Sequence, residues 1–269
     1  MTTQSATETT EPAAVLETFG GIAVVTLNRP RVLNAVNTAL SHAVGTALEE
    51  IARNPAIRVG VITGAGRAFC AGADLRELAA GHSIDAPGHP EWGFAGIARH
   101  FIDKPLIAAV NGFALGGGTE IALACDLVVI DETAALGLPE VKRGLFAAAG
   151  GVLRLPHQLP VKIAMEVALT GEPIAARQAE AFGLVNRVAP VGRSLEVAME
   201  MARAIDANAP LAVRATKRLI HHSAALTSVW EPAAWERNDA EMRAVFESRD
   251  AAEGTRAFTE KRSPSWTGR

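Results

Sequence analysis

The segment of this chain most able to do chemistry combines three consecutive glycines with a nearby glutamate. Gly116, Gly117 and Gly118 lead into a predicted helix at 119–124. The first backbone N–H groups of a helix have no partner within it, lie at the positive end of its dipole, and can donate to a polarised carbonyl oxygen. Glu120 follows Gly117 by three residues and therefore lies on the same face of the first turn. The spacing predicts a carboxylate and an oxyanion donor that face one small volume.

Two opposed effects act on the pKa of Glu120. The helix N-terminus favours the charged carboxylate, whereas burial in a mostly apolar pocket favours the neutral acid. The sequence does not decide which effect is larger. An alternative hypothesis is that Glu120 only stabilises the helix dipole, and the residue considered alone favours that alternative.

Other catalytic or ligand-binding patterns are incomplete. Residues 64–69 lack the third glycine of a dinucleotide fingerprint, and residues 112–118 lack the Lys and Ser/Thr of a P-loop. No Gly-x-Ser-x-Gly elbow is present, so a hydrolase serine is not indicated. Cys70 has no evident base beside it, and we interpret Cys70 and Cys125 as core residues. No metal is expected, because the candidate histidines lack the spacing of a metal site: His82, His89, His100, His221 and His222.

Composition and charge narrow the class of protein. The 269 residues are 49% apolar and 20% charged, and 26 basic residues against 29 acidic ones give a net charge of -3. Without a basic stripe, nucleic acid is not expected as a partner. Two cysteines cannot build a disulfide framework, which indicates a reducing, cytoplasmic location. No apolar stretch reaches the ~20 residues that span a bilayer, and residues 1–12 predict a disordered tail rather than a signal peptide.

The elements that must position these residues alternate in type through the first half of the chain. Short β-prone runs at 13–19 and 22–27 flank two glycines and predict a hairpin. Apolar residues recur every three or four positions from Leu40 to Ile51 and predict an amphipathic helix. The further expected elements are strands at 59–63, 106–110 and 127–130, helices at 74–80 and 119–124, and a loop at 81–90. This alternation predicts an α/β protein with parallel βαβ units.

Helical patterns dominate after Gly151. Helices are expected at 161–169, 175–182, 195–205, 211–220 and 233–246, with one strand at 184–188. Consecutive helices without strands indicate a helical part that packs on the core or on a neighbouring subunit. We therefore predict a core at 13–200 and a helical region at 201–269 that is not an independent domain.

Several segments in order along the chain resemble the enoyl-CoA hydratase/isomerase (crotonase) superfamily. They are Asn28-Arg29-Pro30 with Asn34-Ala35, AFCAGADL at 68–75, KPLIAAVNG at 104–112, GGGTE at 116–120, LPE at 138–140 and FTEKR at 258–262. The resemblance runs from about Ala13 to the C-terminus. It implies a spiral of repeated ββα turns with a C-terminal helical region that mediates trimerisation. It also implies a homotrimer or a dimer of trimers.

The resemblance implies an acyl-CoA thioester as substrate and no separate cofactor, because coenzyme A is part of the substrate. The two oxyanion N–H donors of the family correspond to Ala73 and Gly117. The residues expected to bind coenzyme A are Arg31, Ala71 through its carbonyl, Asp74, Leu75, Arg76, and Lys261 from an adjacent subunit. For the basic residues among these, the alternative is a solvated surface charge. Trp92 and Phe94 either line the acyl pocket or pack against the next helix.

The resemblance also assigns the acid–base chemistry. Hydratases of this family use two glutamates, and both positions are Glu here: Glu120 would hold and activate water, and Glu140 would transfer a proton to the α-carbon. Two departures are present, Leu138 where hydratases usually carry a polar residue, and AAAGG at 147–151 where they carry PGAGG. The expected function is hydration of a 2-enoyl-CoA. Double-bond isomerisation, hydration of a branched or steroid acyl-CoA, and non-catalytic acyl-CoA binding remain alternatives.

Overall fold

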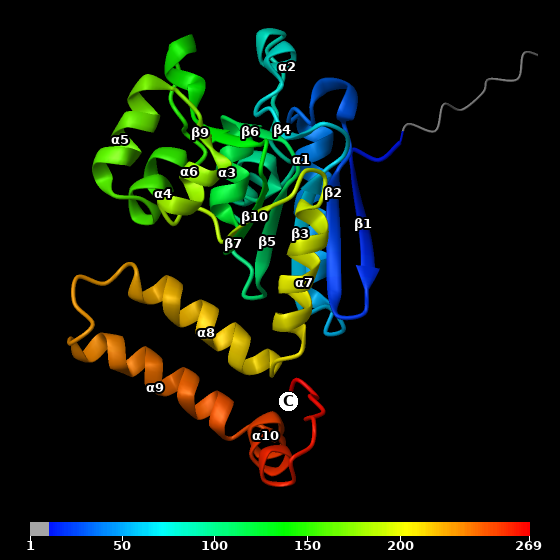
Figure 1. The fold of residues 1–269 in the computed structure, drawn as a ribbon, viewed down its shortest axis with the longest axis vertical. Helices are drawn as coiled ribbons and strands as arrows, with labels where there is room; N and C mark the ends of the chain where they lie inside the picture. The colour runs from blue at the N-terminus through cyan, green and yellow to red at the C-terminus, as the bar shows by residue number, and fades with distance from the viewer. Residues whose placement is uncertain (1–10) are drawn as a thin grey trace, which may run out of the picture.

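A six-stranded sheet forms the centre of the molecule (Figure 1), whose computed structural model describes residues 11–269. Most of the predicted tail at 1–12 therefore lies outside the described residues. The strands, in spatial order, are β1 (Ala14–Phe19), β2 (Ile22–Leu27), β3 (Val59–Gly64), β5 (Leu106–Val110), β7 (Leu127–Asp131) and β10 (Arg187–Ala189). β1 and β2 form the predicted antiparallel hairpin, and the other neighbours in this sheet pair in parallel. The expected α/β arrangement is confirmed.

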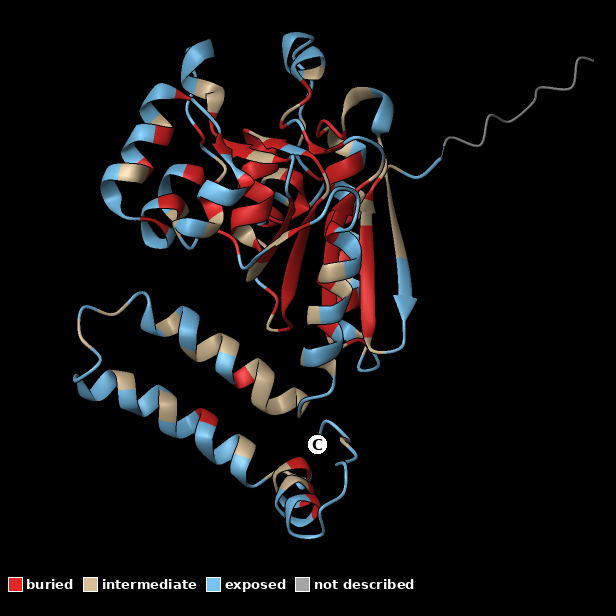
Figure 2. Ribbon diagram, in the orientation of Figure 1, coloured by how far each residue is buried: buried red, intermediate tan, exposed pale blue. Residues whose placement is uncertain are grey.

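Alternate residues of the central strands enter two different cores. Val59 and Val61 of β3 pack with Ala198 of α7 (Ser194–Asp206), whereas Gly60 lies against Ile51 of α1 (Thr38–Arg53) on the other face. Because helices cover both faces, the central strands are apolar at nearly every position. Figure 2 shows these strands buried along most of their length.

Three of the long parallel strands are each followed by a short one, and the short strands form a second sheet. β4 (Ala68–Cys70) follows β3, β6 (Phe113–Leu115) follows β5, and β8 (Ala135–Gly137) follows β7, while β9 (Ile174–Ala175) pairs with β8 at the edge. A helical segment comes after each pair, namely α2 (Leu75–Ala79), α3 (Gly117–Ala124) and the 3-10 helix η4 (Pro139–Arg143). The chain thus advances through three successive turns of strand, strand and helix. No period predicts the short strands, because two or three residues are too few to show one.

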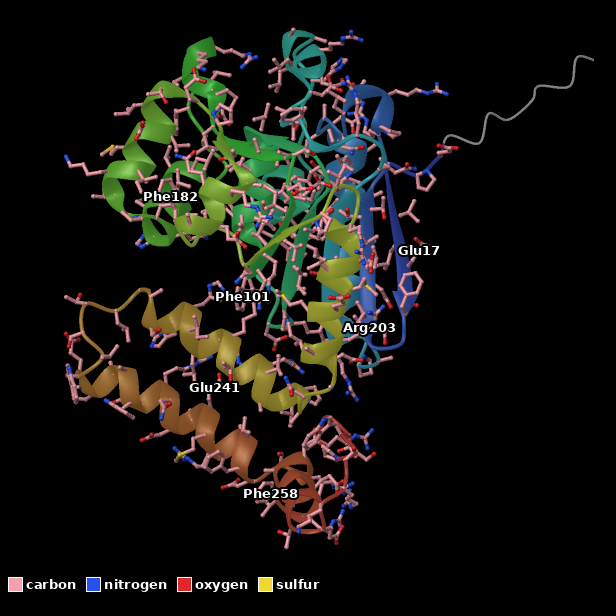
Figure 3. The ribbon with its side chains drawn as sticks, in the orientation of Figure 1. Glu17, Phe101, Phe182, Arg203, Glu241 and Phe258 are labelled. Atoms are coloured by element: carbon pink, nitrogen blue, oxygen red, sulfur yellow. The ribbon has the colours of Figure 1, made fainter. Side chains whose placement is uncertain are left out.

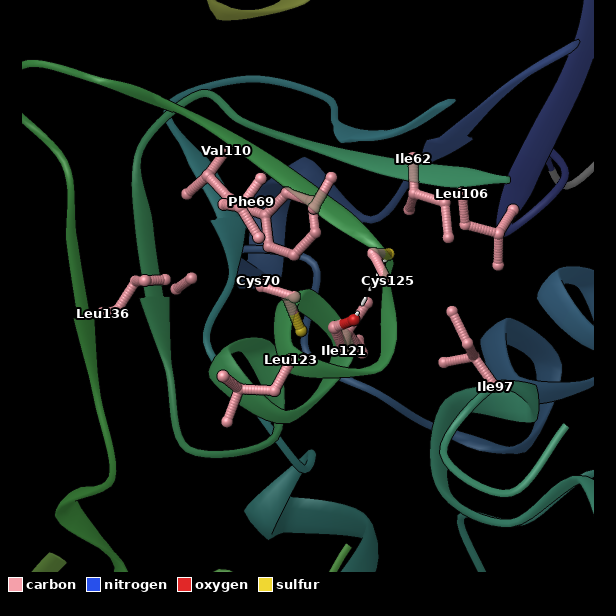
Figure 4. Packing of buried hydrophobic residues seen from close by; sticks show 14 of the residues in the cluster. Ile62, Phe69, Cys70, Ile97, Leu106, Val110, Ile121, Leu123, Cys125 and Leu136 are labelled. Carbon is pink, nitrogen blue, oxygen red and sulfur yellow. Dashed lines mark hydrogen bonds between the residues drawn. The ribbon is translucent and has the colours of Figure 1, made fainter. Parts of the chain in front are cut away.

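Helix α3 lies inside the core, and the two cysteines are buried near it (Figure 4). Cys125 Sγ donates to the carbonyl of Ile121 at 3.5 Å. Burial raises the pKa of the Cys70 thiol to about 12, so the thiol stays protonated at neutral pH. The interpretation of both cysteines as core residues is confirmed.

The C-terminal helices extend away from this core (Figure 1). They are α8 (Pro210–Ser223), α9 (Pro232–Phe246) and α10 (Arg249–Thr259). Ion pairs tie α8 to the core, with Arg214 2.6 Å from Asp103 and Lys217 2.7 Å from Asp126. Figure 3 labels Glu241 of α9, whose carboxylate pairs with Arg218 of α8 at 2.6 Å. Charged contacts thus hold α8 both to the core and to α9.

Most predicted helices are confirmed, with two omissions and one strand misplaced. The helices α5 (Val161–Thr170), α6 (Ala176–Ala181), α7, α8 and α9 match the expected ranges closely. α4 (Gly151–Gln158) went unpredicted because it starts at a glycine and contains Pro156, and α10 because its buried face is mostly acidic, with Asp250 and Glu253. The strand expected at 184–188 is instead β10 at Arg187–Ala189. Leu184 and Val185 are buried, but they precede the strand rather than belong to it.

The boundary predicted at residue 200 falls inside α7, which packs on the central sheet through Ile205. The division of the chain into a core and a helical region stays a prediction. None of the helices within residues 11–269 combines the length and apolar character that crossing a bilayer requires.

Candidate active site

Glu120 lies in the first turn of α3, and its side chain is buried, with 3% of the residue exposed. The hydroxyl of Thr119 donates to the carbonyl of Ala114 at 2.6 Å and accepts from the N–H of Gly137 at 2.9 Å, which fixes the helix start against β6 and β8. The Glu120 Oε1 atom accepts a hydrogen bond from the backbone N–H of Gly151 at 2.8 Å. The carboxylate is therefore held between two parts of the chain that lie 31 residues apart.

The environment raises the pKa of Glu120 to about 7. Burial is the main cause, and the nearby Glu140 carboxylate adds to it, whereas the N–H groups of Gly151 and Ala149 and the Arg154 guanidinium act in the opposite direction. Burial thus outweighs the two N–H donors and the guanidinium at this carboxyl group. A carboxyl group with this pKa exchanges protons near neutral pH, as a general acid or base must.

Glu140 lies on η4, on the other side of the α3 N-terminus. A Cβ atom built on Gly116 would lie 3.0 Å from Oε1 of Glu140, so this carboxyl group lies directly against the glycine that precedes α3. Its Oε2 atom is buried and has no hydrogen-bond partner within residues 11–269. Burial raises the pKa of Glu140, opposed by a backbone hydrogen bond and by Arg143. The structure thus brings together both glutamates that the sequence singled out.

The two expected oxyanion donors also lie side by side. A Cβ atom built on Gly72 would lie 3.1 Å from the backbone nitrogen of Gly117, so the loop before α2 touches the start of α3. Two backbone bonds hold this loop, from Val36 N to Gly72 O at 2.8 Å and from Asp74 N to Val36 O at 2.9 Å. Within residues 11–269, neither Ala73 N–H nor Gly117 N–H donates a hydrogen bond. Both groups are available to a ligand oxygen.

A buried asparagine, Asn34, holds the segment that leads into the Ala73 loop. Asn34 has a positive φ of 57° and is fully buried, and its Nδ2 donates to the carbonyls of Ala65, Ala68 and Phe69 at 3.0, 2.9 and 3.1 Å. This side chain fixes β4 and the turn before it. From the sequence, Asn34 is expected only as part of a family motif. Its structural role was not predictable, because the carbonyls that accept its hydrogen bonds lie 31 to 35 residues away.

The residues expected to bind coenzyme A are distributed unevenly. Ala71, Leu75 and Arg76 are exposed at the start of α2, and Arg31 is exposed in the neighbouring 3-10 helix η1 (Pro30–Val32), two residues before Leu33, whose carbonyl accepts from Ala71 N–H. Asp74 differs, because it is buried: Oδ1 accepts from Arg76 N at 3.2 Å and Oδ2 pairs with Arg29 at 3.0 Å. Its carboxylate therefore caps α2 and anchors the loop.

Lys261 does not join these residues within one chain. It follows α10, at the opposite end of the molecule from α2 (Figure 1). A contact between Lys261 and coenzyme A would thus require a second copy of the chain, as the family resemblance implies.

Of the two aromatic candidates for the acyl pocket, only Phe94 reaches the site. A Cβ atom built on Gly117 would lie 2.3 Å from Cζ of Phe94, so the ring covers the first residue of α3. Trp92 instead stacks between His89 and His100, with ring centroids 3.7 and 5.1 Å away, and packs against Gly45 of α1. For Trp92 the packing alternative holds.

Two cavities lie elsewhere in the molecule. One of about 340 Å³ is lined by residues of α1, α8 and the C-terminus, and one of about 230 Å³ by α4 and α5. Neither is lined by Glu120 or Glu140, and the hydrogen bonds and contacts described above define the candidate site. The described part of the chain has no group of three or more His, Cys, Asp or Glu side chains arranged as metal ligands.

Comparison of the sequence with models of protein families identifies the class to which this fold and site belong. A family model described as enoyl-CoA hydratase/isomerase matches residues 17–269, and the chain belongs to this family. The crotonase fold implied by the sequence is confirmed by a crystal structure of an enoyl-CoA hydratase from Mycobacterium tuberculosis H37Rv. That structure is 44% identical, matches with a TM-score of 0.90, and is covered over 100% of its chain and 96% of this one.

Other relatives carry a more particular name. A carnitinyl-CoA dehydratase of Salmonella typhi is 43% identical over 254 residues, which cover 93% of this chain and 96% of that protein. The crystal structure of a carnitinyl-CoA hydratase from Mycobacterium avium is 53% identical with a TM-score of 0.78, and covers 97% of this chain and 100% of that one. The chain is therefore similar to proteins named for two related activities.

Proposed function

We propose that this protein is an enoyl-CoA hydratase, which adds water across the 2,3 double bond of a 2-enoyl-CoA thioester. One observation carries the proposal: the buried carboxyl group of Glu120 and the half-buried one of Glu140, both with raised pKa values, flank a helix start where two backbone N–H groups have no partner within residues 11–269. A double-bond isomerase of this family usually needs only one such acid, and an acyl-CoA binder needs none. The proposed cytoplasmic location follows from the sequence alone.

The two N–H groups would stabilise the enolate. The thioester oxygen would accept hydrogen bonds from Ala73 and Gly117, and the negative charge that develops on it would lie at the N-terminus of α3. The loss of one such donor typically costs on the order of 2.7–4 kcal/mol of transition-state stabilisation. Because Gly72 and Gly117 are in contact, the donors are preorganised before substrate binds.

The glutamates would divide the proton transfers. As the oxygen of a water molecule bonds to C3 of the substrate, that water gives a proton to Glu120, and the resulting enolate takes a proton at C2 from Glu140. Mutual repulsion disfavours ionising both carboxyl groups, so one accepts while the other donates. One hydroxyl and one hydrogen are added, and exchange with solvent restores the starting protonation.

The two departures from the hydratase pattern leave this arrangement in place. Leu138 is buried and directly precedes η4. Its side chain is apolar, so it offers no hydrogen bond to either glutamate. The segment at 147–151 still presents Gly151 N–H to Glu120 at 2.8 Å. The contact between Gly151 N–H and the Glu120 carboxylate is therefore present although the proline and glycine usually found in this segment are replaced by alanine.

A second candidate substrate is favoured by the comparisons. Relatives at 43% identity, and solved structures at 53%, are named for carnitinyl-CoA. Dehydration of a 3-hydroxyacyl-CoA is the reverse of the proposed reaction, so the same residues would serve it. Carnitinyl-CoA then differs from a simple substrate only in the quaternary ammonium group on its acyl chain.

The test is a turnover panel read by absorbance and mass. Short, medium, long and ring-bearing 2-enoyl-CoA thioesters should lose the absorbance of the conjugated double bond and gain the mass of one water, and carnitinyl-CoA should lose one water. Conversion without a change of mass would instead identify an isomerase. Tight binding of every thioester without turnover would identify a binding protein.

The glutamate assignment has its own test. Glu120→Gln and Glu140→Gln should each lower kcat by about 100-fold or more, because each removes one proton-transfer group. Glu132→Gln, an exposed glutamate before β8, should retain wild-type activity. Activity that survives both site substitutions would exclude the two-glutamate mechanism.

A further inference from the structure

Arg154 of α4 connects two segments that border the glutamate site, and none of the expectations drawn from the sequence includes it. Its Nη2 donates to the carbonyl of Ala98 at 2.6 Å, and its Nη1 to the carbonyl of Ala149 at 3.4 Å. A Cβ atom built on Gly150 would lie 2.0 Å from Nη1, so the guanidinium packs directly on the backbone of Gly150. The contact with Ala98 alone joins two positions that are 56 residues apart in the sequence.

Each of these segments reaches a group in the site. Gly151 donates the 2.8 Å hydrogen bond to Glu120 and is next to Gly150, on which the guanidinium lies. Ala98 N–H donates to the carbonyl of Phe94 at 3.0 Å, and the Phe94 ring covers Gly117. Arg154 is thus linked, through one neighbouring residue on each side, to the segment that binds Glu120 and to the segment that carries the Phe94 ring over Gly117.

Arg154 is also the cation that acts on Glu120. Burial lowers the pKa of Arg154, and the Glu120 carboxylate acts against that shift, just as the guanidinium acts against the rise in the pKa of Glu120. Around Glu120, the other charged neighbour is Glu140 on η4, itself under the influence of Arg143. Cys70 on β4 and Cys125 at the end of α3 are buried thiols with raised pKa values and stay neutral. Arg154 therefore opposes both burial and the second carboxyl group.

We propose that Arg154 is a positioning residue for the hydration step: its guanidinium ties the loop that binds Glu120 to the segment that carries Phe94, and places a positive charge that favours the carboxylate form of Glu120. This inference rests on the proposed function for its catalytic consequence. Its electrostatic part concerns the unliganded protein and holds for any reaction at this site.

Two substitutions separate the geometric part from the electrostatic part. Arg154→Gln removes the charge and should lower kcat by about 10- to 100-fold, with little change in KM, since coenzyme A binds elsewhere. The acidic limb of the kcat/KM profile should move to higher pH, because without the cation Glu120 protonates more readily. Arg154→Lys keeps the charge but not the planar fork, so kcat should fall while the acidic limb stays near its wild-type position.

A readout without turnover distinguishes this inference from the proposed function. Glutamate labelled with ¹³C at the carboxyl carbon reports the titration of Glu120 by NMR in the unliganded protein, with the signal assigned by Glu120→Gln. The Glu120 titration should move to higher pH in Arg154→Gln and return in Arg154→Lys. Arg177→Gln, which removes an exposed arginine of α6 that pairs with Glu180, is the matched control and should change nothing.

Each outcome decides the question. If the wild type turns over no enoyl-CoA but the titration moves as described, the proposed hydratase activity is wrong and the placement of Arg154 stands. If Arg154→Gln lowers only the melting temperature and leaves the Glu120 titration unchanged, Arg154 is structural and the inference is overturned. If Arg154→Gln does not fold, a wild-type titration and wild-type kcat in Arg154→Lys would overturn the geometric part, and a lowered kcat would support it.

Discussion

At the scale of single residues, the site depends on groups placed close to the two carboxyls rather than on the carboxyls alone. Glu120 has one strong neutral donor, Gly151 N–H, and one cation, Arg154, while Glu140 has an oxygen without a partner among residues 11–269. Burial therefore raises the pKa of both. The unpartnered oxygen of Glu140 is an acceptor, or a donor when protonated, that a substrate can satisfy.

The close contact between Gly117 and Phe94 makes a prediction about stability. Gly117→Ala would place a methyl group 2.3 Å from Cζ of Phe94 and should destabilise the protein by about 1–3 kcal/mol through overpacking. Introduced into a Phe94→Ala variant, Gly117→Ala should cost little further free energy of unfolding in denaturant, because the ring that the new methyl group would meet is gone. Additive losses in the double variant would show that the two residues are not in contact.

Much of this residue-level picture could be predicted, but not all of it. The closeness of Glu120 and Gly117 follows from helix geometry within one turn, and Glu140 and Ala73 followed from the family resemblance. Arg154 and Asn34 could not be assigned roles, because their partners lie 56 and 31 to 35 residues away and no local period connects them. Asp74 was expected at the coenzyme, yet its carboxylate is engaged by Arg29 and by the start of α2.

At the scale of elements, a buried lysine from another part of the chain, Lys104, caps the C-terminal end of α1. Lys104, with 4% of the residue exposed, donates from Nζ to the carbonyls of Ile51 and Asn54, both at 2.7 Å. The last carbonyls of a helix have no partner within it, and a cation there also balances the helix dipole. The residue before β5 thus fixes the C-terminus of the helix that covers one face of the sheet.

This contact predicts a large effect from a single substitution. Lys104→Met should lower the free energy of unfolding by about 1–3 kcal/mol, because it leaves two carbonyl groups without their donor. Denaturant unfolding measures the change, and Lys162→Met, an exposed lysine of α5, should fall within about 0.5 kcal/mol of the wild type. Equal losses at both positions would contradict the role of Lys104 as a cap.

Element prediction succeeded where a segment is long and periodic. The amphipathic helices α1, α5 and α7 and the buried strands β3, β5 and β7 match their expected ranges to within a few residues. The short strands of the second sheet exist because neighbouring turns pair with one another, and α10 exists because Asp250 and Glu253 bind backbone and arginine groups of the C-terminal segment. Such long-range and polar contacts have no apolar pattern in the sequence.

At the scale of the whole molecule, the C-terminal helices leave large apolar side chains uncovered. Trp230 is 86% exposed and Phe258 is 87% exposed, and Figure 3 shows Phe258 at the far end of the helical region. Exposed apolar residues of this size on one region indicate a surface that another protein covers. A second copy of the chain would also be needed to bring Lys261 to a coenzyme site.

These features support a prediction about assembly. The protein should sediment as a species of about 85 kDa or twice that, three or six times the 28.2 kDa chain. Phe258→Glu should shift the population toward smaller species and raise KM for the acyl-CoA. Phe19→Glu, at an exposed phenylalanine that ends β1, should leave both unchanged. A fully active monomer would contradict the prediction.

The three successive turns of strand, strand and helix have a consequence for how such a site can change over time. Ala73 follows the short strand of the first turn, Gly117 that of the second, and Glu140 that of the third. Each contribution thus comes from the same place in a different repeat. A change after β8 can replace the proposed acid while the two proposed N–H donors stay untouched, so the chemistry of the proposed site can change through mutation in one repeat at a time.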